Sequence, residues 1–197
     1  LADAIRASGV DAAAVEKRKT HWAAEHTRLW DADRAAEAEV AANPQIHPLT
    51  LAAALGEALP ENSFYVDETI THRGILLRHL QNRGPQSYFR PQGGLGQGIG
   101  IALGVKLAAR DRPVVLVVGD GSFMYNPVIQ ALALSHHQDL PILIVISNND
   151  GYLAMKKEHH AFYPDGVSAA NDLFYGEPVT DLDYAEIAKL FGGFGRR

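Results

Sequence analysis

Two stretches in the middle of the chain, residues 113–118 and 141–146, are almost entirely apolar. A strand that is exposed on one face alternates apolar and polar residues, whereas a strand that is covered on both faces is apolar throughout. The segment between the two stretches is long enough for a helix. It opens with Asn126-Pro127, a capping residue followed by proline at the first helical position. The pattern therefore predicts two neighbouring parallel strands joined by a crossover helix.

The apolar pattern on either side of this unit continues the alternation of helices and strands. It predicts helices at 49–59, 71–80 and 96–109, strands at 63–66 and 88–89, and a last helix that begins at Asp183. Helices and strands that alternate along a chain are typical of an α/β fold. We expect an open parallel sheet with helices on both faces.

The first 45 residues differ in character from the rest of the chain. They are rich in alanine and charged residues, with Val15, Trp22 and Leu29 spaced by seven on one helical face. This spacing predicts an amphipathic helical segment at 1–45, followed by an α/β domain at 46–197. Because another strand is expected after the last predicted helix, the sequence suggests a domain truncated at its C-terminus within a longer enzyme.

Polar residues follow both buried strands directly. Gly119-Asp120-Gly121 ends the first apolar run, and Asn148-Asn149 follows the second run after 26 intervening residues. Ligands of an open parallel sheet bind at the carboxyl ends of its strands. Asp120 and Asn149 offer the oxygen ligands that Mg²⁺ or Ca²⁺ prefers, Gly121 permits close approach of a phosphate, and Ser122 can donate to it. The pair of motifs predicts a site for a metal-bound diphosphate, although either motif alone is typical of an ordinary turn.

Gly-Asp-Gly followed at this interval by Asn-Asn resembles the thiamine diphosphate (ThDP)-dependent enzymes. The upstream sequence Gly93-Gly94-Leu95-Gly96 is most similar to the acetolactate synthase and benzoylformate decarboxylase branch of that family. The resemblance covers approximately residues 46–195, with the most specific motifs at 93–152. It implies that 46–197 is a ThDP diphosphate-binding domain and that 1–45 is the tail of a preceding middle domain with its linker.

The resemblance also implies which residues hold the cofactor and its metal. Asp120, the side chain of Asn149 and the main-chain carbonyl of Gly151 would bind Mg²⁺. The carbonyl of Gly93 would face the 4'-amino group of the cofactor, and Leu95 would lie beneath the bend between its two rings. The diphosphate contacts implied are at Thr71, Gly121 and Ser122.

The activity implied is that of a ThDP- and Mg-dependent decarboxylase or carboligase acting on a 2-oxo acid, with the cofactor as electron sink. An acetolactate-synthase-type transferase and a 2-hydroxyacyl-CoA lyase remain alternatives. A structural or regulatory relative that has lost the cofactor is a rival of a different class. From the residues alone, a metal-dependent phosphatase or phosphotransferase using Asp120 is also open, but no second acid or base is evident nearby.

The family activates the cofactor through a glutamate on another domain, usually that of the partner subunit, and no glutamate here matches that position. Glu68 matches a different position, where we expect a role at a helix start or in a salt bridge. The site is therefore expected to be completed by the pyrimidine-binding domain of the same or a partner subunit, in a homodimer or homotetramer. The fragment alone is expected to be inactive.

Composition narrows the function further. A net charge of -5 and a pI near 6.0 provide no basic stripe for nucleic acid, and no apolar stretch has the length of a membrane span. The chain has no cysteine, which leaves the redox compartment open and the cytoplasm as a default. His72, His159 and His160 are candidates for the pocket without an assigned role. The segment 156–177, rich in Phe, Tyr, Pro and Gly, predicts a long loop that acts as a lid.

Overall fold

The computed structural model describes residues 1–80, 84–174, 179 and 182–197, and the chain divides into two compact units, Leu1–Ala53 and Ala54–Arg197. The first unit contains α1 (Ala2–Ala7), α2 (Ala12–Val40) and the start of α3 (Pro48–Ala58). The side chain of Asp11 begins α2 by accepting hydrogen bonds from the main-chain N–H groups of Ala13 and Ala14. The predicted helix is confirmed. None of its residues is buried, and Trp22 on the predicted apolar face is 64% exposed.

The second unit contains a four-stranded parallel sheet in the order β2-β1-β3-β4. The strands are β1 (Phe64–Glu68), β2 (Tyr88–Phe89), β3 (Val114–Gly119) and β4 (Leu143–Ser147). The two apolar runs thus form neighbouring strands, with Gly119 opposite Ser147. This register brings the carboxyl ends of β3 and β4 to the same level, as the sequence predicts.

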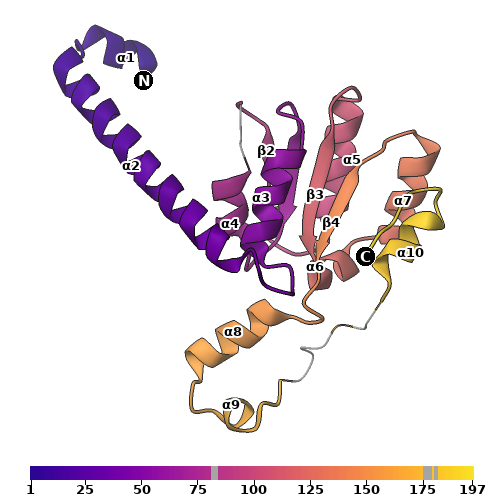
Figure 1. The fold of residues 1–197 in the computed structure, drawn as a ribbon. Helices are drawn as coiled ribbons and strands as arrows, with labels where there is room; N and C mark the ends of the chain where they lie inside the picture. Colours follow the sequence, from indigo (N-terminus) through magenta and orange to yellow (C-terminus); the bar gives the residue numbers. More distant parts are fainter. Residues whose placement is uncertain (81–83, 175–178, 180–181) are drawn as a thin grey trace. The chain divides into compact units, whose positions relative to one another are not determined.

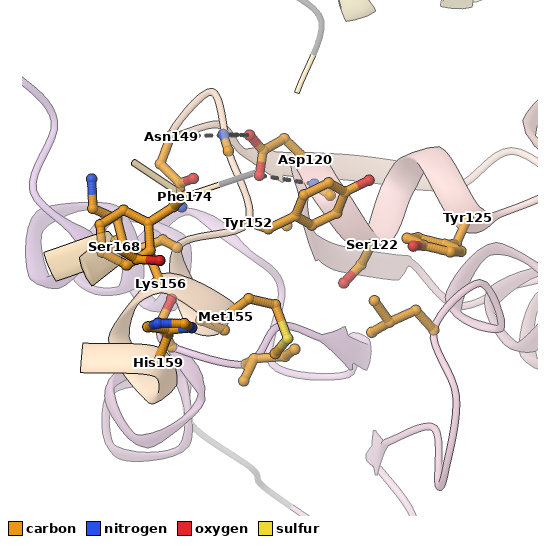
Figure 2. A pocket seen from close by; sticks show the side chains of 18 residues that line it. Asp120, Ser122, Tyr125, Asn149, Tyr152, Met155, Lys156, His159, Ser168 and Phe174 are labelled. Atoms are coloured by element: carbon orange, nitrogen blue, oxygen red, sulfur yellow. Dashed lines mark hydrogen bonds between the residues drawn. The ribbon is translucent and has the colours of Figure 1, made fainter. Parts of the chain in front are cut away.

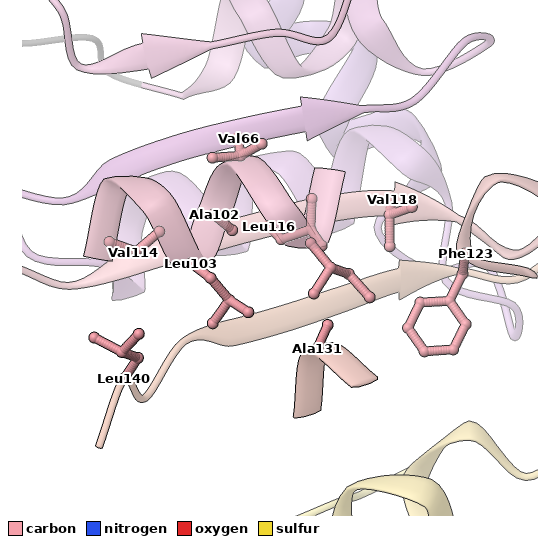
Figure 3. Packing of buried hydrophobic residues seen from close by; sticks show 10 residues of the cluster. Val66, Ala102, Leu103, Val114, Leu116, Val118, Phe123, Ala131 and Leu140 are labelled. Atoms are coloured by element: carbon pink, nitrogen blue, oxygen red, sulfur yellow. The ribbon is translucent and has the colours of Figure 1, made fainter. Parts of the chain in front are cut away.

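The hydrophobic core lies against the central strand β3. Its residues Val114, Leu116 and Val118 pack in one cluster with side chains of α5 (Gly98–Ala108) and α7 (Val128–His137) (Figure 3). Val115 and Val117 point to the opposite face and are equally buried. β3 is therefore covered on both faces, which explains its uniformly apolar sequence and confirms the predicted α/β class.

The remaining helices are α4 (Arg73–His79), α6 (Asp120–Tyr125), α8 (Leu153–Phe162), α9 (Val167–Asn171) and α10 (Tyr184–Lys189). Figure 1 shows α6 beginning where β3 ends, and the chain leaving β4 toward α8 at the same edge of the sheet. Among the described helices, none is both long and apolar enough to cross a bilayer.

Two local predictions are wrong. Asn126 does not cap the crossover helix, because Pro127 is the residue that precedes α7 and the amide of Asn126 binds other segments of the domain. The segment 156–177 is not one long loop, because much of it forms the end of α8 and the whole of α9. Residues 175–177 of that segment lie outside the described residues.

Candidate functional site

A cavity of about 530 Å³ opens at the carboxyl ends of β3 and β4, where α6 and α8 begin (Figure 2). It brings together Asp120, Asn149 and Gly151, the three residues predicted to bind the metal. Four of the five predicted cofactor contacts also line it: Thr71, Leu95, Gly121 and Ser122. Gly93 is not among the lining residues. It lies two positions before Leu95, with a positive φ of 91°.

Asp120 is the first residue of α6, and its side chain is almost completely buried, with 2% of the residue exposed. Its Oδ1 accepts a hydrogen bond from the N–H of Gly121 at 2.9 Å. Its Oδ2 accepts from the N–H groups of Asn149 at 3.3 Å and Gly151 at 3.1 Å. These bonds tie the start of α6 to the loop after β4.

Such burial disfavours an ionised carboxylate unless charge or hydrogen bonds compensate it. Main-chain N–H groups compensate Asp120 in part, and a divalent cation bound at the same carboxylate would compensate it further. The cation's other ligands could be the amide oxygen of Asn149 and the carbonyl of Gly151, since both residues line the same cavity. The donor set therefore fits Mg²⁺.

The loop 148–151 presents Asn149 to the cavity because its neighbours bind each other. The Asn148 amide donates to the carboxylate of Asp150 at 2.9 Å, and the Asp150 N–H donates back to the Asn148 side chain at 3.2 Å. Asp150 adopts a positive φ of 57°, which closes this tight turn. The turn leaves Asn149 lining the cavity beside Gly151.

Gly121 leaves room for the ring of Tyr152. A Cβ at position 121 would lie 2.7 Å from both Cδ1 and Cε1 of that ring. The ring also contacts Tyr125 edge-on, with centroids 6.3 Å apart. Burial raises the pKa of the Tyr152 hydroxyl, and Tyr125 and Asp120 act in the same direction. Glycine at position 121 therefore allows the Tyr152 ring to pack against the start of α6.

The far end of the cavity is formed by α8, α9 and the segment after α9. The lining residues there include Met155, Lys156, Ser168 and Phe174. The last three belong to the segment 156–177 that the sequence predicts as a lid, but none of the four was assigned singly. Lys156 pairs with Asp172 at 3.1 Å and lies 4.9 Å from the centre of the Phe174 ring. Their approach depends on the path of α9, and no motif marks that path in the sequence. Tyr152 could have been found, because it directly follows the predicted metal loop.

Of the three histidines considered, His159 lines the cavity, where its ring packs edge-on against Phe174 with centroids 5.5 Å apart. His160 packs against the same phenylalanine but is not among the lining residues. Nδ1 of His72 lies 2.8 Å from the hydroxyl of Ser147 at the end of β4. Only His159 is thus placed to face a ligand.

Comparison with known proteins gives consistent matches for this domain. The family described as "Thiamine pyrophosphate enzyme, C-terminal TPP binding domain" matches residues 70–197. An acetolactate synthase large subunit of Parasynechococcus marenigrum is 30% identical over 159 residues, 74% of this chain and 24% of that protein. A benzoylformate decarboxylase of Pseudomonas aeruginosa is 30% identical over 148 residues, 75% of this chain and 26% of that protein.

Among solved structures, the ThDP-dependent 4-hydroxybenzoylformate decarboxylase of Rhodococcus jostii superposes with a TM-score of 0.66 at 28% identity. The match covers 75% of this chain and 26% of that one. The chain thus spans about a quarter of the length of the relatives it matches.

Proposed function

Because this chain belongs to the thiamine pyrophosphate enzymes, through their C-terminal TPP-binding domain, we propose that its cavity binds thiamine diphosphate through a Mg²⁺ ion. The observation that carries the proposal is the convergence of Asp120, Asn149 and Gly151 on one cavity from two neighbouring strand ends. A hard cation held by two side-chain oxygens and a carbonyl retains open positions for phosphate oxygens.

The residues predicted from the sequence then each have a defined task. Asp120, the Asn149 amide and the Gly151 carbonyl hold the metal, while Gly121 and Ser122 receive the diphosphate. Thr71 contacts the phosphates. Leu95 supports the bend of the cofactor, and the Gly93 carbonyl receives its 4'-amino group. When bound, the cofactor supplies an electron sink for breaking or forming a carbon–carbon bond beside a carbonyl group.

The reaction we propose is decarboxylation or carboligation of a 2-oxo acid. Transfer of the acetolactate synthase type and cleavage of a 2-hydroxyacyl-CoA are the alternatives, and proteins with those names are among the relatives. This chain supplies the metal and diphosphate half of the site. The activating glutamate comes from the pyrimidine-binding domain of the same or a partner subunit, in a homodimer or homotetramer.

The test is the affinity of the intact protein for ThDP in Mg²⁺ buffer, measured by calorimetry. Asp120→Asn removes the one carboxylate of the metal set, and we expect it to abolish measurable binding. Asp111→Asn, at an exposed turn before β3, is the matched control and should bind as the wild type does. Unchanged affinity in Asp120→Asn would contradict the assignment.

A second measurement separates the catalytic proposal from a relative that has lost the cofactor. Release of CO₂ from a panel of 2-oxo acids is followed with ThDP and Mg²⁺ added, and cleavage of a 2-hydroxyacyl-CoA is assayed in parallel. Binding of ThDP without turnover of any substrate in the panel would favour the structural or regulatory relative. Turnover of the acyl-CoA alone would favour the lyase.

A further inference from the structure

Glu68, the last residue of β1, points its buried carboxylate at the start of α5, with 4% of the residue exposed. Its Oε1 accepts hydrogen bonds from the N–H groups of Gly96 at 2.7 Å and Gln97 at 2.8 Å. Its Oε2 accepts from the N–H of Gly98 at 3.1 Å. The prediction of a role at a helix start is confirmed, although the helix belongs to a segment 28 or more residues away.

Asn126, which follows α6, completes the same network and is 6% exposed. Its Nδ2 donates to Oε2 of Glu68 at 2.7 Å and to the carbonyl of Ser122 at 2.9 Å. Its Oδ1 accepts from the N–H of Ile99 at 3.0 Å. Glu68 and Asn126, which we call the clamp, therefore join three segments: the end of β1, the start of α5 and the last turn of α6.

The turn before α5 packs very closely against the clamp and against α6. A Cβ at Gly98 would lie 2.6 Å from Oε2 of Glu68, and a Cβ at Gly96 would lie 2.4 Å from the carbonyl oxygen of Tyr125 in α6. Gly96 also has a positive φ of 92°. Only glycine, which has no Cβ, fits at both positions without displacing Glu68 or the main chain of Tyr125.

The turn is also held from its other side. The side-chain amide of Gln97 donates to the carbonyls of Gln92 at 3.2 Å and Gly94 at 2.6 Å. The N–H of Gln97 is itself bound to Glu68. The turn at 92–97 carries Gly93 and Leu95, whereas α6 carries Asp120, Gly121 and Ser122. The clamp is consequently a hydrogen-bonded link between two segments that both contribute residues to the cavity.

The negative charge of the Glu68 carboxylate strengthens its hydrogen bonds to the start of α5. Glu68 faces three consecutive N–H groups at the N-terminus of an eleven-residue helix, where a carboxylate is favoured by the helix dipole. Hydrogen bonds to an ionised acceptor are about twice as strong as those between neutral groups. Loss of the acceptor charge would leave several buried donors competing for weaker partners.

We propose that Glu68 and Asn126 are positioning residues that fix the turn bearing Gly93 and Leu95 relative to the diphosphate-binding start of α6. They do not touch the cofactor. They set the distance between the groups that hold its ring portion and those that hold its diphosphate. This inference rests on the proposed function, because it assigns the turn bearing Gly93 and Leu95 to the ring portion of thiamine diphosphate and the start of α6 to its diphosphate.

The test uses the intact protein with ThDP, Mg²⁺ and the best 2-oxo acid of the panel. For Glu68→Gln we expect about tenfold weaker ThDP affinity by calorimetry, the size expected from losing charge-assisted hydrogen bonds. We also expect kcat at saturating cofactor to fall about tenfold, with KM for the substrate within about twofold of wild type. Glu39→Gln, an exposed glutamate of α2, is the matched control.

Exchanging the amide and the carboxylate between positions 126 and 68 provides a second test, in which ThDP affinity and kcat are measured. In Asn126→Asp two carboxylates face each other, so affinity should fall further than in Glu68→Gln. In the double variant Glu68→Gln with Asn126→Asp, the amide is at position 68 and the carboxylate at position 126, so the hydrogen bond between them can form with donor and acceptor exchanged. We expect this variant to recover part of the affinity and of kcat. Gln97→Ala loosens the same turn from its exposed side and should lower kcat even if the buried variants fail to fold.

The outcomes are distinct. Wild-type affinity and kcat in Gln97→Ala and in every folded clamp variant would overturn the positioning role, as would a loss of thermal stability with kcat unchanged at saturating cofactor. Failure of the wild type itself to bind ThDP would instead overturn the proposed function, and this inference with it.

Discussion

At the scale of single residues, buried acidic side chains gather at the ends of the strands, and each accepts hydrogen bonds from a different set of donors. Asp120 is held by main-chain N–H groups of the loop 148–151, and Glu68 by the start of α5. Asp67, 1% exposed, accepts from the N–H and the hydroxyl of Thr69 and from the hydroxyl of Tyr88. Only Asp120 of these three lines the cavity. Burial of an acid here is therefore not by itself a sign of a ligand.

The Tyr88 hydroxyl provides a test of this network by pH. Burial, and then the hydrogen bond to Asp67, raise its pKa well above the ordinary value of 10.0. A raised pKa means that the folded state holds the proton more tightly than the unfolded state does. The stabilisation is thus complete below the unfolded pKa and is lost as the pH rises above it.

We expect Tyr88→Phe to lower the free energy of unfolding at pH 7 by about 1–3 kcal/mol, because a buried carboxylate oxygen loses its donor. Above about pH 10 the difference from wild type should shrink, because the unfolded tyrosine then ionises. Urea unfolding of this chain from pH 7 to 11 measures both effects, with the exposed Tyr163→Phe as control. A difference that stays constant up to pH 11 would contradict the raised pKa.

Residues could be placed from the sequence where a strand fixes them. Asp120 and Asn149 each end an apolar run, so the parallel pairing of β3 and β4 alone brings them together. Their roles as metal ligands stay predictions. The ring of Tyr152 and the carboxylate of Glu68 act across the fold, on Gly121 and on α5, and no local pattern specifies such partners.

At the scale of elements, the main helices and strands were predictable because burial of one or both faces sets the spacing of apolar residues along each element. The predicted bounds of α3 and α5 lie within two residues of those observed. α6 was missed because Asp-Gly-Ser is typical of a turn, and only docking against β3 and β4 makes it helical. α8 and α9 were missed because the Phe, Tyr, Pro and Gly content of 156–177 predicted a loop, although the proline and glycines of that segment lie outside both helices.

The glycines of α5 give a test at this scale. Gly98 has no room for a Cβ, which would meet Glu68 at 2.6 Å and Leu116 at 2.9 Å. Gly104, on the exposed side of the same helix, has no heavy atom of the described chain within 4 Å of its would-be Cβ. Gly98→Ala should destabilise this chain by about 1–3 kcal/mol through overpacking.

Gly104→Ala should stabilise the chain by about 0.5–1 kcal/mol, because alanine costs less conformational entropy in a helix. Urea midpoints of the two variants, measured side by side, check the opposite signs. Equal changes in the free energy of unfolding would contradict the close approach of Glu68 to Gly98.

At the scale of the whole molecule, exposed apolar residues border the cavity. Leu95 is 39% exposed, Met155 58% and Tyr125 61%, and all three line the cavity. A ligand pocket normally buries most of its ligand, so we expect these residues to be covered when a ligand is bound.

If the pyrimidine-binding domain of the same or a partner subunit covers these apolar residues, the chain alone retains the metal and diphosphate contacts and loses the rest. We expect its affinity for ThDP in Mg²⁺ buffer to be at least about tenfold weaker than that of the intact protein, a loss of about 1.4 kcal/mol or more. It should release no CO₂ from 2-oxo acids, because the activating glutamate is absent. Calorimetry and a CO₂ assay on both proteins check this, with Asp120→Asn in the chain as the control for unspecific binding. Equal affinities would mean that the exposed apolar border is not where the second domain binds, and turnover by the chain alone would place the activating group among its own residues.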